Sequence, residues 1–137
     1  MSGANDATGG NVGRRALSTE HASQPVARYS QGIAAAGLVF TAGQGAHHPE
    51  TGALPDGIEA QTTRTLENVD AILRAGGASL ATAVKITVYL ADRQDYAAMN
   101  EAYDRHMPAT PAARTTVQAG LGRGMLIEID AIALALE

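Results

Sequence analysis

The sequence lacks cysteine altogether and has few aromatic residues, with one Phe, four Tyr and no Trp among its 137 residues. The absence of cysteine excludes disulfides, thiolate nucleophiles and cysteine-ligated metals. It also fits a reducing compartment, so we expect a cytoplasmic location. Because aromatic side chains are scarce, the interior of the protein has to be built from Ala, Val, Ile and Leu.

Long apolar runs and an excess of basic charge are missing as well. No apolar run approaches the roughly 20 residues of a membrane helix, and the first residues lack the apolar segment of a secretory signal. We therefore expect no association with a membrane. The formal net charge of −4 argues against nucleic-acid binding, which usually needs a basic face.

What is present is the composition of a globular protein, with 45% apolar and 18% charged residues. The length predicts one domain. Residues 1–23 are rich in Gly, Ala, Asn, Ser and Thr, and such a segment buries too little apolar surface to order the chain. We therefore predict a flexible tail over residues 1–23 and a single folded domain over residues 24–137.

Two segments have the periodicity of helices. The first begins after Asp56, which we expect to cap it with Glu59 as the capping-box partner, and it ends at Gly76-Gly77. The second runs from about residue 92 or 94 to His106. The apolar stripe of the first helix consists of Ile58, Thr62, Leu66, Val69, Ile72 and Leu73.

Five further segments are typical of strands. A hairpin turns at Ala36-Gly37, residues 84–90 alternate between apolar and polar, and the last two strands cover about residues 114–119 and 125–134. The order is β-β-α-β-α-β-β. Because crossovers between strands are right-handed, we predict an α+β fold in which both helices cover the same face of one sheet.

The last strand, "MLIEIDAIALAL", is apolar on both of its faces beyond Asp130. A sheet with one face in water would alternate instead. A β-bulge would explain the pattern, but we favour a second subunit that covers the face left open by the helices.

Several phrases of the sequence occur together in one known family. They are "ARYSQGI", "FTAGQ", "PETG", "QTTRTLENVDAILRAGGASLATAVKITVYLADRQDYAAMNEAY" and "PAARTTVQAG" followed by "IEIDAIA". In this order they resemble the reactive intermediate deaminase family, also called Rid or YjgF and once labelled L-PSP endoribonuclease. The resemblance covers about Pro25 to the C-terminus.

This resemblance implies a chorismate-mutase-like homotrimer in which the sheets form an inner barrel, the helices lie outside and clefts lie between subunits. It also implies hydrolysis of 2-imino acids, such as 2-iminobutanoate and 2-iminopropanoate, to 2-keto acids and ammonia, with no cofactor. Around the implied cleft the sequence departs from the family pattern, since "AGQGA" replaces "SGQIP". A specialised branch that serves one catabolic or biosynthetic pathway is therefore an alternative.

Arg114 and Glu128 lie at positions where the resemblance implies the chemistry. Arg114 matches an arginine that binds the substrate carboxylate, and its planar fork of N–H donors suits that task better than a lysine. Glu128 matches a glutamate that activates water and returns a proton to the leaving nitrogen. The alternative for either residue is an ion pair with a structural role. Asp130, on the same strand face as Glu128, is expected to be structural.

The resemblance implies four more substrate-binding positions. Tyr29 matches a tyrosine whose hydroxyl reaches the ligand, although it could also lie at the edge of the core. Asn100 matches an asparagine near the site, and Thr116 occupies a position where the backbone holds the substrate nitrogen or water. Ala42 replaces a serine in a ligand-contacting stretch.

Adjacent histidines at positions 47 and 48 invite a metal site. Adjacent residues seldom reach one ion, and no third ligand is spaced suitably, so we expect no metal. Two other functions stay open. One is a non-catalytic module that binds a small carboxylate, and the less favoured one is an endoribonuclease, which the acidic charge opposes.

Overall fold

The computed structural model describes residues 13–136. The strands are β1 (Arg14–Leu17), β2 (Gly32–Ala35), β3 (Leu38–Thr41), β4 (Ala83–Leu90), β5 (Ala113–Gln118) and β6 (Ile127–Leu134). The helices are α1 (Ile58–Ala75) and α2 (Tyr96–Asp104), and two short 3₁₀ turns, η1 (Leu80–Thr82) and η2 (Arg93–Asp95), precede β4 and α2.

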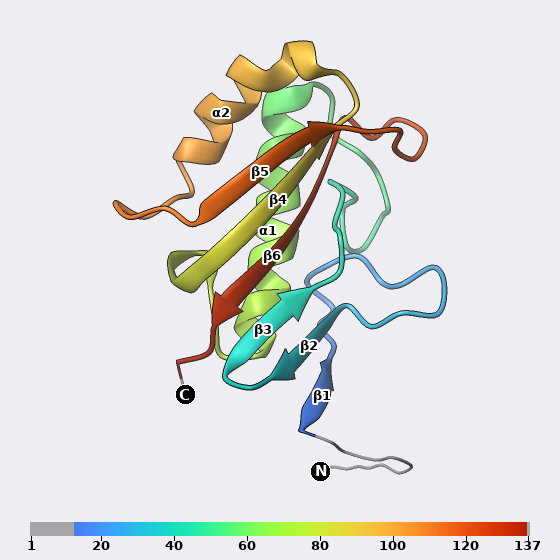
Figure 1. The fold of residues 1–137 in the computed structure, drawn as a ribbon. Helices are drawn as coiled ribbons and strands as arrows, with labels where there is room; N and C mark the ends of the chain where they lie inside the picture. The colour runs from blue at the N-terminus through green and yellow to red at the C-terminus, as the bar shows by residue number, and fades with distance from the viewer. Residues whose placement is uncertain (1–12, 137) are drawn as a thin grey trace.

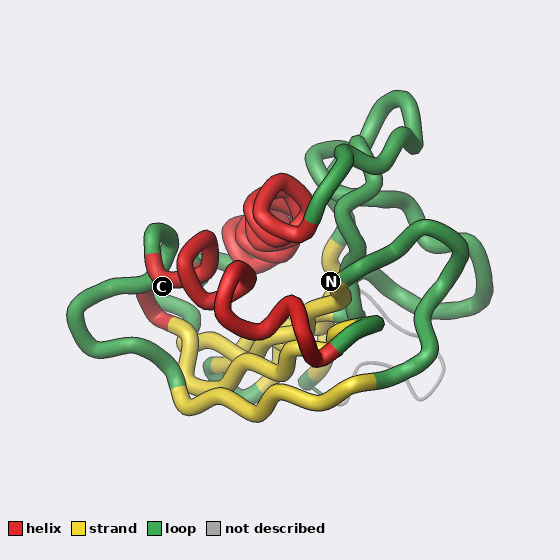
Figure 2. The backbone as a smooth tube through the Cα atoms, turned by 90° about the horizontal axis from the view of Figure 1, so that it is seen from above, coloured by secondary structure: helices red, strands yellow, loops and turns green. Residues whose placement is uncertain are grey.

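The strands form one six-stranded sheet in the order β1-β2-β3-β6-β4-β5 (Figure 1). Only the β4–β5 pair is parallel, and the other pairs are antiparallel. Both helices lie on one side of this sheet, as Figure 2 shows. The predicted α+β architecture with two helices on one face is therefore confirmed. Within residues 13–136, no helix has the length and apolar character needed to cross a membrane.

The core lies between α1 and the middle of the sheet. The stripe residues Leu66, Val69, Ile72 and Leu73 are fully buried, and α1 packs mainly on β6 and α2. From the sheet, Ile86, Val88, Ile127 and Ile129 face the helices and are inaccessible to solvent. The 3.6-residue period of the helix and the two-residue period of the strands thus meet in one aliphatic layer, as the scarcity of aromatics requires.

The prediction of a flexible tail is wrong for residues 14–23. Here the chain forms β1, which pairs with β2 and buries Leu17. The buried amide of Gln31 then holds the following segment, because its Nε2 donates to the carbonyls of Thr19 and Ser23 at 3.0 and 2.8 Å. The part of the predicted tail over residues 1–12 lies outside the described residues.

The ends of both helices differ from the prediction in detail. Gly57, with φ 88°, is the N-cap of α1 and no side chain caps the helix, so the capping role predicted for Asp56 is wrong. The positive φ favours a residue without a Cβ, so glycine suits the turn into the helix. Asp92 does cap a helical segment, but that segment is the 3₁₀ turn η2, after which α2 begins at Tyr96.

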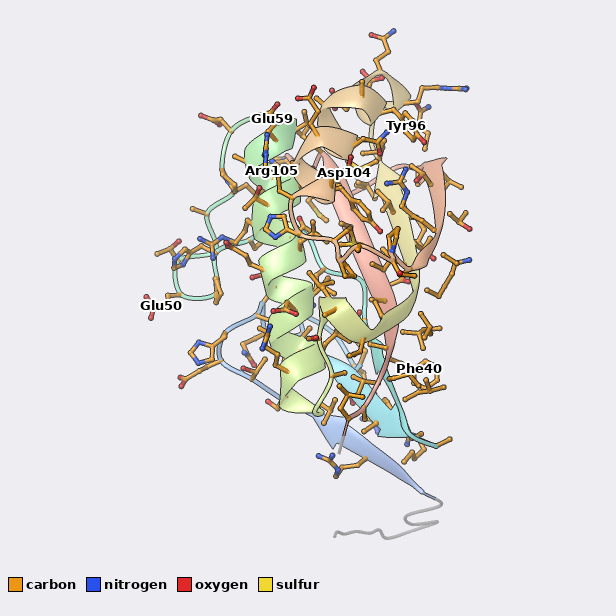
Figure 3. All side chains as sticks on the ribbon, turned by 90° about the vertical axis from the view of Figure 1, so that its left-hand side faces the viewer. Phe40, Glu50, Glu59, Tyr96, Asp104 and Arg105 are labelled. Atoms are coloured by element: carbon orange, nitrogen blue, oxygen red, sulfur yellow. The ribbon has the colours of Figure 1, made fainter. Side chains whose placement is uncertain are left out.

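The face of the sheet away from the helices has an apolar part on β3 and β6. In the apolar part, Phe40 pairs with Ile132 and Leu38 with Leu134; Phe40 and Leu134 are 38% and 47% exposed. Figure 3 shows Phe40 on the side of the sheet away from α1. The β4–β6 pair does have a register shift typical of a bulge, but it lies in β4, between Ala83 and Lys85. The last strand itself alternates between helix-facing and open-facing residues, so its apolar open side is a surface feature.

Candidate active site

Two buried amides of α1 fix the loops at the end of β3 and the beginning of β6. Asn68, fully buried, donates from Nδ2 to the carbonyls of Gly45 and His47 at 3.0 and 2.9 Å. Two helical turns earlier, Gln61 donates to the carbonyls of Pro55 and Gly124 and accepts from the N–H of Leu126. These contacts tie two loops that are distant in sequence to one helix and so set the shape of the space between them.

That space is a cavity of about 390 Å³. Tyr29 and Glu128, two of the predicted site residues, both line it. The full lining consists of Ser23, Gln24, Val26, Tyr29, Gly43, Gln44, Gly45, His47, His48, Pro49, Gly52, Met125 and Glu128. Ala42 is not among these residues, whereas its neighbour Gly43 is.

The Glu128 carboxylate lies against the backbone at Gly43. A Cβ at position 43 would collide with the carboxylate, so the glycine makes room for it. Burial raises the pKa of Glu128, and the charge of Asp130 raises it further. Within residues 13–136 no Lys, Arg or His forms an ion pair with Glu128. A carboxylate that has a raised pKa and lines a cavity is suited to take up and release protons.

Asp130 points to the same face of the sheet but has a protein partner. The Tyr89 hydroxyl donates to Asp130 Oδ2 at 3.0 Å across β4 and β6. Burial and this bond raise the pKa of Tyr89, which keeps its hydroxyl protonated as the donor. The contact agrees with the structural role expected for Asp130.

Arg114 lies on the other face of the sheet. It pairs with Ile86, which is buried beneath the helices, so the two side chains project to the helix side. The guanidinium carbon lies 4.7 Å from the ring centroid of Tyr103 and 5.6 Å from that of Tyr96, and one N–H donates to the Tyr96 hydroxyl at 3.2 Å. Among the described residues no carboxylate lies within 4.0 Å of Arg114. The aromatic rings therefore hold the guanidinium while leaving its charge uncompensated.

Asn100 and Thr116 belong to the surroundings of Arg114. Tyr96, Asn100 and Tyr103 follow one another at helical spacing along a single face of α2. Thr116 pairs with Val88 and lies two residues after Arg114 on the same face of β5. Asn100 Oδ1 and Thr116 Oγ1 are both buried without a hydrogen-bond partner in the described part of the chain, and buried polar atoms usually have one.

The candidate residues therefore fall into two groups, called candidate half-sites, that do not meet within one chain. The glutamate half-site consists of Glu128, Tyr29 and the cavity, and the arginine half-site consists of Tyr96, Asn100, Tyr103, Arg114 and Thr116. Strand β4 separates them, since its Tyr89 pairs with Glu128 on the open face while its Ile86 pairs with Arg114 on the helix face. A molecule bound to Arg114 is thus on the wrong side of the sheet for Glu128 of the same chain.

The adjacent histidines have different surroundings. His48 Nδ1 accepts the N–H groups of Glu50 and Thr51 at 3.1 and 3.3 Å and so organises the loop. Over residues 13–136 no group of three or more His, Asp or Glu is placed to hold a metal ion. The expected absence of a metal stays a prediction.

Sequence reasoning missed Gln61, Asn68, Tyr96 and Tyr103 as parts of the site. A signal for the first two was present, because Gln61, Thr65, Asn68 and Ile72 follow one another at helical spacing beside the apolar stripe. Polar residues on a buried helix face need partners, and here the partners are loop carbonyls. No comparable signal linked the two tyrosines to Arg114, since that contact depends on how β5 lies beside α2.

Comparisons with known proteins agree with this structure. The Endoribonuclease L-PSP family matches residues 19–135. The chain is 43% identical over 124 residues to a RutC family protein of Pyrococcus abyssi, which covers 89% of this chain and 98% of that protein. It is 41% identical over 125 residues to the chloroplastic Reactive Intermediate Deaminase A of Arabidopsis thaliana, which covers 90% of this chain and 67% of that protein.

A solved structure gives the same result in three dimensions. The crystal structure of Escherichia coli TdcF with bound serine superposes on this chain with a TM-score of 0.82 at 37% identity, and the match covers 88% of this chain and 98% of that one. The fold, the site-bearing segments and these relatives converge, and the chain belongs to the reactive intermediate deaminase (RidA/YjgF) family.

Proposed function

We propose that the protein hydrolyses 2-imino acids, with 2-iminobutanoate and 2-iminopropanoate as representative substrates, to 2-keto acids and ammonia without a cofactor. The observation that carries this proposal is the pair of complementary, uncompensated groups. Among the residues described, Arg114 has no carboxylate partner in an ion pair, and Glu128 has no basic partner. A 2-imino acid offers what both lack, a carboxylate next to an electrophilic carbon.

The reaction site forms between protomers of a homotrimer. Two observations support this arrangement: the half-sites lie on opposite faces of the sheet, and the open face carries exposed apolar side chains at Phe40 and Leu134. Covering that face with a second copy brings the arginine half-site of one protomer to the glutamate half-site of the next. It also buries apolar surface, which stabilises the assembly.

The chemistry needs only proton transfer and positioning. Arg114 binds the substrate carboxylate bidentately, which places the C=N carbon next to a water on Glu128. Glu128 takes a proton from the water, the oxygen bonds to carbon, and the C=N electron pair moves to nitrogen. The protonated Glu128 then gives its proton to this nitrogen, which forms a carbinolamine with a hydroxyl and an amino group on one carbon. Glu128 next takes the hydroxyl proton and passes it to the nitrogen, so that the C–N bond breaks as the C=O bond forms and ammonia leaves.

A complementation experiment tests the intersubunit site. Arg114→Ala and Glu128→Gln chains, each inactive alone, are co-expressed with different tags and the mixed trimers are isolated. Each mixed trimer contains an interface with a native Arg114 and a native Glu128, so imine hydrolysis should return. The assay measures ammonia and keto acid released from imino acids that an amino-acid oxidase generates in place.

The matched control pairs the Arg114→Ala chain with a chain that carries both substitutions, because no interface of that mixture has two native halves. Mixed trimers that stay as inactive as this control would contradict the intersubunit site. A native protein that binds 2-keto acids but hydrolyses no imine would instead indicate the non-catalytic carboxylate-binding module.

A further inference from the structure

Besides Glu128, the cavity of the glutamate half-site is lined by side chains of different chemistry. Among residues 13–136, Glu128 is the only acidic residue in the lining. The remaining polar side chains include two imidazoles, from His47 and His48, together with Ser23 and Gln24. Ser23 Oγ and Gln24 Nε2 already donate to backbone carbonyls, so the two imidazoles are the side chains of this set that are left to bind a ligand.

His47 is held in place from two sides. Its carbonyl accepts hydrogen bonds from Asn68 Nδ2 at 2.9 Å and from Ser23 Oγ at 3.4 Å. Asn68 also donates to the carbonyl of Gly45, two residues earlier. The backbone that carries the imidazole is thus fixed to α1 and to the segment after β1.

Gly45 provides the space for the His47 ring. A Cβ at position 45 would lie 3.3 Å from His47 Nδ1 and 2.6 Å from Met125 Cε. Its backbone has no positive φ, so close packing and not conformation favours glycine at this position. The replacement of "SGQIP" by "AGQGA" in the sequence therefore has a structural consequence, because a side chain at position 45 would move the Met125 methyl group and crowd the His47 ring.

His48 contributes a donor of fixed orientation. Its Nδ1 accepts two backbone N–H groups, from Glu50 and Thr51. In the neutral ring the proton is then on Nε2, which is left as a donor. Two imidazoles in the lining of one cavity suit a ligand group that accepts several hydrogen bonds, and a carboxylate has the largest capacity of the common side-chain acceptors.

We propose that His47 selects the substrate side chain and that the site prefers 2-imino acids whose side chain ends in a carboxylate over those with an alkyl side chain. The inference rests on the proposed function, because it assumes that Glu128 marks the reacting end of the cavity. It goes further by naming the substrate class and the residue that recognises it.

Binding of two keto acids of similar length tests the proposal by calorimetry, with 2-oxoglutarate as the dicarboxylate and 2-oxohexanoate as its alkyl counterpart. The native protein should bind 2-oxoglutarate more tightly. His47→Leu should weaken the binding of 2-oxoglutarate about tenfold, the loss expected for one hydrogen bond to a charged group. It should not weaken 2-oxohexanoate. His21→Leu, which replaces an exposed histidine outside the cavity, is the matched control and should change neither affinity.

The native preference alone decides the proposal if His47→Leu does not fold. Equal or tighter binding of 2-oxohexanoate by the native protein would overturn it, and so would a His47→Leu protein in which both keto acids weaken equally. Imine hydrolysis without any side-chain preference would refute this inference and leave the proposed function intact. Selective binding of 2-oxoglutarate without hydrolysis of any imine would refute the proposed function and leave the preference for a side-chain carboxylate intact.

Discussion

The two half-sites differ in how the fold holds them. The glutamate half-site is enclosed by loops that the buried amides Gln61 and Asn68 tie to α1, and burial raises the pKa of its carboxylate. The arginine half-site lies on the edge strand β5, where aromatic rings hold a guanidinium beside an open surface. Proton transfer benefits from a partly desolvated base, whereas capture of an anion benefits from an accessible charge. In the proposed mechanism each half-site is suited to a different task.

Separating the two half-sites by preventing trimer assembly should have the largest effect on activity. Phe40→Arg places a charge in the apolar part of the open face, where a second protomer is expected to pack. We expect a folded monomer in sedimentation, with no measurable imine hydrolysis, because desolvating the charge opposes association. Ala60→Arg, on the exposed side of α1, is the control and should remain trimeric and active. A trimeric, active Phe40→Arg protein would refute the assignment of this face.

Inactivating the glutamate half-site alone should have the second largest effect on activity. Glu128→Gln keeps the shape and a hydrogen-bonding group but removes the base, so kcat should fall about 10²–10⁴-fold, the usual contribution of general acid–base catalysis. Binding of a 2-keto acid, measured by calorimetry, should persist. Asp130→Asn, on the same face, should lose much less activity. If Glu128→Gln also loses keto-acid binding, the residue mainly shapes the cleft.

The raised pKa of Glu128 makes the pH dependence specific. Activity of the native protein should fall as the pH is lowered through this pKa, and Asp130→Asn should move the fall to lower pH, because the Asp130 charge no longer raises the pKa. The folded state binds its proton at Glu128 more readily than the unfolded chain does, so this group lowers stability as the pH rises. Glu128→Gln should therefore not reduce the melting temperature at neutral pH, unlike the loss of a stabilising carboxylate.

The sequence predicted the helices and strands of this fold better than the contacts between segments that are distant in sequence. The stripe of α1 and the hairpin at Ala36-Gly37, where φ is 54° and 78°, follow from local periodicity and turn chemistry. Strand β1 was missed because its sequence, "RRAL", buries only Leu17 and gains its order from pairing with β2. Local patterns carry no information about such a partner.

The same limit applies to the site. Alternation along the last strand placed Glu128 and Asp130 on one face, as observed. The face of Arg114 could not be predicted, because it depends on the register of β5 against β4, and a shift of one residue would have reversed it. The resemblance supplied the identities of both residues, and only the register shows that they lie on opposite sides.

The smallest predicted effect separates binding from chemistry within the arginine half-site. Tyr96→Phe keeps the ring beside Arg114 but removes the hydroxyl that accepts its N–H at 3.2 Å. The guanidinium retains Tyr103 at 4.7 Å, so it stays in place with more freedom to turn. We expect KM to rise roughly two- to tenfold, as for loss of one hydrogen bond, with kcat nearly unchanged. Tyr89→Phe is the matched control, since its hydroxyl bonds to Asp130 instead, and it should leave KM unchanged. A change in kcat without a change in KM for Tyr96→Phe would mean that this hydroxyl acts on the reacting atoms and not on the orientation of Arg114.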